Sequence, residues 1–214
     1  MAEATGDEPD ARLEAAVLDA LGSVAYDGGR LDRAAGYYRR CLAHQRAIGD
    51  DAGLAVTNGN LGSIARARGD PAAARKYHER SLAIRREIGD RAGAATSLDN
   101  LGAVARDAGD TEAAREHYRE SLRVGRETDG RAGVATSLDA LARLARAEGD
   151  IETARNRHRE AAAIGQEIGD HEGVGASRAA LGSLARARSD LPTAEDLYRE
   201  ASHHYREAGA VPAG

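Results

Sequence analysis

Four arginines recur at a fixed spacing and are the residues best suited to recognising a ligand. Arg66, Arg106, Arg146 and Arg186 lie forty residues apart in a chain with 30 Lys+Arg, 35 Asp+Glu and a net charge of -5. A guanidinium group presents a planar fork of N–H donors that matches a carboxylate or phosphate. The series therefore predicts a local basic stripe on an otherwise acidic protein.

The same arginines also have a purely structural interpretation. Arginines on exposed helices commonly pair with acidic side chains, and each such pair contributes little to stability. Asp99, Asp139 and glutamates of neighbouring helices are the expected partners. The sequence alone leaves both interpretations open.

The remaining polar residues form no recognised catalytic pattern. His78 and His158 occupy a position that Tyr38, Tyr118 and Tyr198 hold elsewhere, which favours a packing role for a ring with a polar tip. No phosphate-binding glycine loop, zinc-protease motif or nucleophile elbow occurs. We therefore expect a protein that is not an enzyme, with no cofactor and no metal.

The composition excludes several classes of protein. The chain is 42% hydrophobic and 30% charged, which is too apolar for a disordered tail. Cys41 is the only cysteine, so no intrachain disulfide or cysteine zinc cage can form. No segment has the pattern of a membrane span or signal peptide. We expect a cytoplasmic protein, without a nucleic-acid or membrane partner, and the excess of arginine over lysine favours a bacterial origin.

A leucine followed by a small residue marks a forty-residue repeat. No insertion or deletion interrupts the spacing, and an alanine follows each leucine after thirteen positions. The leucines are Leu21, Leu61, Leu101, Leu141 and Leu181, and the alanines are Ala34, Ala74, Ala114, Ala154 and Ala194.

Each repeat is predicted to fold as two amphipathic helices joined by a tight turn. In Gly69-Asp70-Pro71, glycine ends one helix in a left-handed conformation, aspartate caps the next, and proline occupies its first turn. Asp129-Gly130 and Ser189-Asp190 depart from this order. First helices are expected over 11–27, 51–68, 91–108, 131–148 and 171–188. Second helices are expected over 30–48, 70–88, 110–128, 150–168 and 190–208.

The pattern resembles the tetratricopeptide repeat, in the forty-residue version of kinesin light chains and actinobacterial regulators. The Leu-Gly pair, the Gly-Asp turn and the alanine and aromatic positions of the second helix carry the resemblance, as in Gly109, Ala114 and Tyr118. It implies an all-α, right-handed superhelical solenoid of five helix-turn-helix repeats over 11–208. The units run over about 11–50, 51–90, 91–130, 131–170 and 171–208. An acidic, disordered tail is expected over 1–10 and a second tail over 209–214.

The resemblance also implies that the first helices line a concave groove. We expect a protein or peptide ligand there, in the form of an acidic or extended segment. The candidate binding residues are Asn60, Ser63, Arg66, Asp99, Asn100, Arg106, Asp139, Arg143, Arg146, Ser183 and Arg186.

The leading functional hypothesis is a non-catalytic scaffold or adaptor for protein interactions. One alternative is the regulatory or sensor module of a bacterial transcription regulator. Another is a small-molecule biosynthetic enzyme that uses the groove as a pocket. The last helix carries an apolar stripe that includes Leu191, Leu197 and Tyr198, which predicts either a self-capped end or a homodimer through the C-terminal end.

Overall fold

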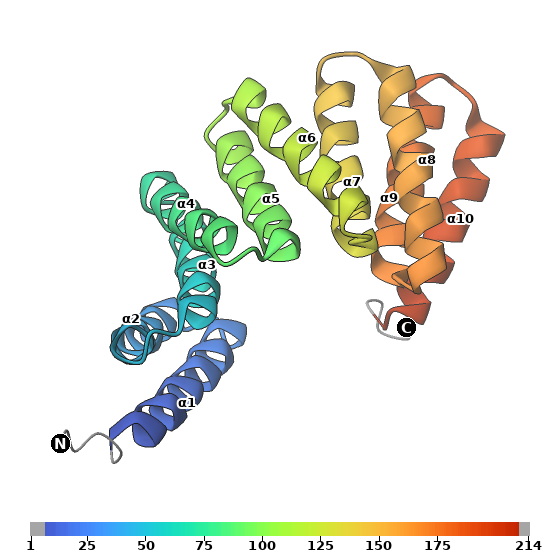
Figure 1. The fold of residues 1–214 in the computed structure, drawn as a ribbon. Coiled ribbons are helices and arrows are strands. Elements are labelled where there is room, and N and C mark those ends of the chain that lie inside the picture. The colour runs from blue at the N-terminus through green and yellow to red at the C-terminus, as the bar shows by residue number, and fades with distance from the viewer. Residues whose placement is uncertain (1–6, 210–214) are drawn as a thin grey trace. The chain divides into compact units, whose positions relative to one another are not determined.

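The computed structural model describes residues 7–209, and this part of the chain is helical throughout, with no strand (Figure 1). The predicted all-α class is confirmed. The chain divides after Asp110 into two compact units. Unit 1 holds α1 (Asp7–Asp27), α2 (Leu31–Ala47), α3 (Asp51–Ala67), α4 (Pro71–Glu87) and α5 (Arg91–Asp107). Unit 2 holds α6 (Thr111–Glu127), α7 (Arg131–Ala147), α8 (Ile151–Ile168), α9 (His171–Ala187) and α10 (Leu191–Glu207).

The helix boundaries agree closely with those expected from the repeat, except at the start of the chain. Helix α1 begins at Asp7, within the segment expected to be a disordered tail. The rest of that expected tail, residues 1–6, and residues 210–214 lie outside the described residues. The single solenoid over 11–208 stays a prediction, since each unit is described by itself.

The turns follow the predicted chemistry at most junctions. Asp70 and Asp150 accept hydrogen bonds from the backbone N–H groups of Ala73 and Thr153, at 2.9 and 3.1 Å. Asp129 and Ser189 replace glycine and still adopt the left-handed conformation, with φ of 53° and 62°. A side chain is disfavoured there, so the repeat geometry is imposed on these two turns by the surrounding packing.

Close approach within each hairpin explains why a small residue follows the marker leucine. A Cβ atom at Gly22 would lie 2.7 Å from the Tyr38 ring, and one at Gly62 would lie 2.6 Å from the His78 ring. The aromatic or imidazole ring of the second helix therefore packs directly on the backbone of the first. The thirteenth-position alanines are buried at the same seam.

The two ends of the described chain expose different amounts of apolar surface. On α1, Leu13 and Val24 are 65% and 61% exposed, and Val17 and Leu21 extend the same stripe. On α10, Leu191 and Tyr198 are exposed, whereas Ala201 is buried and Tyr205 packs on Gly175. No helix in the described range has the length and apolarity needed to cross a membrane.

Candidate functional site

In unit 1 the arginines of the predicted ladder share one carboxylate. Arg66 Nε on α3 donates to Asp107 Oδ2 on α5 at 2.5 Å, and Arg106 Nη2 donates to Asp107 Oδ1 at 2.8 Å. Burial acts to raise the pKa of Asp107, but the hydrogen bonds and charges of the two arginines outweigh it and lower that pKa. Arg66 and Arg106 thus take part in ion pairs, as the structural interpretation expects, with Asp107 as their shared partner.

The other predicted residues of unit 1 contribute less to a common site. The Ser63 hydroxyl donates to the Gly59 carbonyl of its own helix at 3.2 Å. Asn60 and Asn100 are half-buried, at equivalent positions of α3 and α5. Asp99 is also half-buried and has an interaction partner.

In unit 2 the arginines at the same repeat position have different surroundings. Arg146 and Arg186 are exposed in the last turns of α7 and α9, and no ion pair to either is found among the described residues. Ser183 instead contacts the Tyr198 hydroxyl of α10 at 3.1 Å, so its side chain is directed to the second helix of its repeat. The ladder arginines of unit 2 therefore differ from those of unit 1, which both contact Asp107.

Asp139 lies at the centre of a polar cluster on α7. Its Oδ1 atom is 2.7 Å from Nδ1 of His158 on α8 and 3.5 Å from the Ser177 hydroxyl on α9, and Arg143 pairs with Oδ2. An ionised carboxylate can only accept hydrogen bonds, so the Nδ1 atom of His158 carries the hydrogen. The structure thus brings together the predicted Asp139 and Arg143 and adds two residues that the sequence did not indicate.

A substitution in the repeat explains how Ser177 joins this cluster. In earlier repeats a serine hydroxyl on the second helix forms a hydrogen bond with a serine hydroxyl on the first helix of the next repeat. Ser81 contacts Ser97 in this way at 3.0 Å, and Ser121 contacts Ser137 at 3.1 Å. Ala161 replaces the first of these hydroxyls in the fourth repeat. Ser177 has therefore lost its usual partner and donates to Asp139. Comparing the residues at these two positions across the repeats would have shown from the sequence that Ser177 lacks its usual hydroxyl partner.

The cluster is arranged for structure rather than for nucleophilic attack. Ser177 and His158 each contact Asp139 and no contact joins them, whereas an activated serine needs a hydrogen bond to its base. Burial acts to raise the pKa of Asp139, but the hydrogen bond from His158 and the charge of Arg143 prevail, and this pKa lies below its ordinary value. Asp139 is a buried anion that holds three helices together.

A depression of about 300 Å³ lies beside this cluster, between α7 and α9. Asp139, Arg143 and Ser177 line it, together with Asp170 and Glu172 from the start of α9. Asp170 is engaged as the cap of α9, because it accepts a hydrogen bond from the N–H of Gly173 at 2.9 Å. We call the surface formed by α7 and α9 around this depression, with Arg146 and Arg186, the first-helix surface of unit 2.

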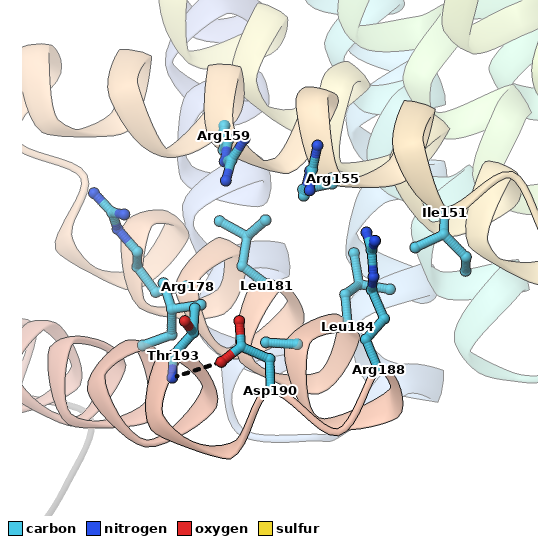
Figure 2. Close-up of a pocket in the computed structure, with 11 residues that line it drawn as sticks. Ile151, Arg155, Arg159, Arg178, Leu181, Leu184, Arg188, Asp190 and Thr193 are labelled. Atoms are coloured by element: carbon cyan, nitrogen blue, oxygen red, sulfur yellow. Dashed lines mark hydrogen bonds between the residues drawn. The ribbon is translucent and has the colours of Figure 1, made fainter.

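A second hollow of unit 2 shares no lining residue with that depression. It has a volume of about 540 Å³ and is bordered by α8, α9 and α10. Figure 2 shows Arg155 and Arg159 projecting from α8 toward Leu181 and Leu184, with Arg178 on α9 and Arg188 directly after the end of α9. These arginines were not among the residues predicted for a site, although Arg155 follows Arg75 and Arg115, and Arg159 follows Arg119, at the forty-residue spacing. No group of His, Cys, Asp and Glu in the described range could hold a metal ion.

These observations define an all-α protein of repeated helical hairpins. Family comparison gives the class its name: the tetratricopeptide repeat family matches residues 53–127 and 133–207, and a second description of the same repeat matches 17–52. The chain belongs to the tetratricopeptide repeat family, as its resemblance predicted. A comparison with the curated proteins found no match.

Solved structures with the same fold come from several settings. BtubC (BKLC) from P. vanneervenii is 22% identical, with a TM-score of 0.79 over 97% of this chain and 90% of that one. A putative kinesin light chain from Podospora anserina with nearly identical repeats is 17% identical, with a TM-score of 0.68 over 92% and 97%. A Rap protein complexed with competence and sporulation factor is 15% identical, with a TM-score of 0.79 over 91% of this chain and 55% of that one. These similarities show the fold.

Proposed function

We propose that this chain is a protein-interaction scaffold whose first-helix surface of unit 2 holds an extended protein segment. Tetratricopeptide repeats form a family of interaction modules, which supports the general role. The observation that carries the specific proposal is that Arg146 and Arg186 are exposed at equivalent positions of α7 and α9 and have no ion-pair partner within residues 7–209. Each offers a fork of donors to an acidic side chain of the ligand.

The charges of this surface favour one orientation of the bound segment. Asp170 and Glu172 lie at the start of α9, whereas Arg146 and Arg186 lie in the last turns of their helices. A segment with a donor or basic group at one end and carboxylates at the other complements this arrangement. Asp139 is already satisfied by three side chains and serves as a fixed support for the surface rather than as a ligand contact.

The experiment is a selection of random displayed peptides on the purified chain, followed by affinity measurements on its variants. We expect the selected peptides to be enriched in Asp and Glu. Arg146→Ala with Arg186→Ala should weaken them by about tenfold or more, because charge-assisted hydrogen bonds are lost. Arg66→Ala with Arg106→Ala is the matched control at the same repeat positions and should leave the affinity unchanged. Equal affinity for wild type and the Arg146/Arg186 variant would contradict the proposal.

Two further hypotheses concern a regulatory role and self-association. The regulatory module of a bacterial transcription regulator is compatible with the family, and no observed feature favours it over the scaffold. The homodimer through the C-terminal end is tested by sedimentation of the full chain over a range of concentrations, with Leu191→Ser as the disrupting variant. The more apolar α1 supplies the comparison, through Val24→Ser.

A further inference from the structure

The groove bordered by α8, α9 and α10 combines arginines with an aliphatic floor. Arg155 and Arg159 come from α8, Arg178 comes from α9, and Arg188 directly follows the last residue of α9. Leu181 and Leu184 lie between Arg178 and Arg188 in sequence and in space, as Figure 2 shows. A site of this kind favours a ligand that alternates anionic and aliphatic groups.

The donors of this groove are only partly satisfied by the protein itself. Glu152 pairs with Arg155 at 2.5 Å and with Arg188 at 3.1 Å, and Glu200 pairs with Arg178 at 3.2 Å. The Nε atom of Arg155 is buried without a hydrogen-bond partner, and no partner of Arg159 is found among the described residues. A buried N–H group without an acceptor costs free energy, which a bound carboxylate would recover.

The spacing of the arginines fits an extended chain. Arg155 and Arg159 are one turn apart on α8, a rise of about 6 Å. Alternate residues of an extended peptide are separated by about 6.6 Å and point to the same side. Arg178 on α9 and Arg188 at its C-cap are separated by a rise of about 15 Å, which is too far for one phosphate or carboxylate group to bridge.

We propose that this groove is a second binding site, which takes an extended acidic peptide with carboxylates at alternate positions and aliphatic side chains between them. The carboxylates bind Arg155 and Arg159, and the aliphatic side chains lie over Leu181 and Leu184. Glu152 competes with the ligand for Arg155 and Arg188. The site is separate from the first-helix surface of unit 2, and it does not depend on the function proposed for that surface.

The test measures fluorescence anisotropy of a labelled peptide, Ac-GELELELG-NH2, titrated with the full chain. A peptide with Gln in place of each Glu is the matched probe. We expect the Glu peptide to bind, the Gln peptide to bind at least about tenfold more weakly, and affinity to fall as salt is added. A single-stranded thymidine oligonucleotide of similar charge should bind more weakly than the Glu peptide.

Two variants change the groove in opposite directions. Arg159→Ala removes an exposed side chain with no observed partner, so the fold is retained, and we expect about a tenfold loss of affinity. Glu152→Gln removes the competing carboxylate, and we expect a gain of severalfold. Arg123→Ala, an exposed α6 arginine paired with Glu127 outside the groove, is the control and should change nothing.

Three results would overturn the proposal. They are equal binding of the Glu and Gln peptides, unchanged affinity in both groove variants, and tighter binding of the oligonucleotide. The Arg146→Ala and Arg186→Ala variant separates the two sites. If it alone abolishes binding of the Glu peptide, the peptide occupies the first-helix surface and the groove proposal is wrong.

Discussion

The second and fourth repeats place a histidine at the same position and give it opposite surroundings. His78 packs on Gly62 in unit 1, and both of its ring nitrogens are buried with no hydrogen-bond partner in the part of the chain that the structure describes. His158 in unit 2 is equally buried and hydrogen-bonded to Asp139. The second repeat has Gly59 at the position that Asp139 holds in the fourth repeat. One residue on the neighbouring helix therefore decides whether the imidazole is an apolar filler or part of an ionic network.

The arginine series divides in the same way. Arg66 and Arg106 meet Asp107, whereas the equivalent positions after Arg146 and Arg186 are Ala147 and Ala187. The four arginines occupy the same position of the repeat, and those of unit 1 differ in having Asp107 within reach, forty-one positions after Arg66 and one position after Arg106. In both cases the role of a repeated residue depends on a second position of the repeat, at which the copies carry different residues.

The largest expected effect concerns the buried anion of unit 2. Asp139→Ala should lower the free energy of unfolding by roughly 3 to 5 kcal/mol, because it leaves His158, Ser177 and Arg143 without their acceptor. Arg143→Ala is the control, since it removes only the more exposed partner and should cost under about 1 kcal/mol. Denaturant unfolding of both variants checks this, and similar small losses would show that the cluster contributes little.

His78 should make the protein sensitive to mild acid. Burial, together with the charges of Arg66 and Arg85, lowers its pKa from 6.5 to about 4. The unfolded chain binds a proton below pH 6.5 that folded His78 does not accept until about pH 4, so stability falls as the pH falls through this window. The total loss is about 3 kcal/mol, at 1.36 kcal/mol for each unit of pKa shift.

His78→Tyr is the control for this pH dependence. Tyr38 and Tyr198 occupy the equivalent position, and their hydroxyl groups contact Ser23 and Ser183. Ser63 holds the same repeat position as these serines and can contact the hydroxyl of the introduced tyrosine. The variant should fold and should lose most of the slope of unfolding free energy between pH 6.5 and 4. A slope that persists would assign the acid sensitivity to other groups.

A smaller change should convert the second repeat toward the fourth. Gly59→Asp places a carboxylate at the position of Asp139, and a Cβ atom at Gly59 meets nothing closer than Ser81 at 3.8 Å. We expect the pKa of His78 to rise toward its ordinary value, and NMR titration of the imidazole ring measures this change. Gly59→Ala separates this effect from the gain in helix propensity and should leave the pKa of His78 low.

The smallest expected effect is on the paired arginines of unit 1. Arg66→Ala should reduce the free energy of unfolding by under about 1 kcal/mol, because the Arg66–Asp107 pair is partly exposed and screened by solvent. Thermal unfolding at low and high salt measures it, and the difference from wild type should shrink as salt rises. A loss as large as that of Asp139→Ala would remove the contrast between the two units.

Much of the local fold could be predicted from the sequence because the repeat encodes it redundantly. The marker leucines, the turn glycines and the capping aspartates each indicate the same helix boundaries. The marker Leu21 is the exception to burial, at 41% exposed, because it lies on α1, where no described helix packs over that face. The early start of α1 was missed because the repeat has no turn signal at that point.

The candidate site could be predicted only in part, because it depends on pairs between helices. Asp139 and Arg143 were expected in the groove from the family resemblance, whereas the contact of Ser183 with Tyr198 was not foreseen, since it depends on the second helix. Asp107 was missed as the partner of Arg66, because it lies one position after Arg106 and outside the positions considered for the groove. Arg155 and Arg159 were missed because their groove is formed by three helices.

The central claim is that an aspartate at the position of Asp107 decides whether the ladder arginines beside it are paired or available, and Ala187→Asp tests it most directly. This substitution reproduces in unit 2 the position that Asp107 holds relative to Arg66. NMR titration of the carboxyl introduced at position 187 should give a pKa below the ordinary aspartate value, as for Asp107, and adding Arg146→Ala should raise it again. An unshifted pKa that is insensitive to Arg146 would contradict the account.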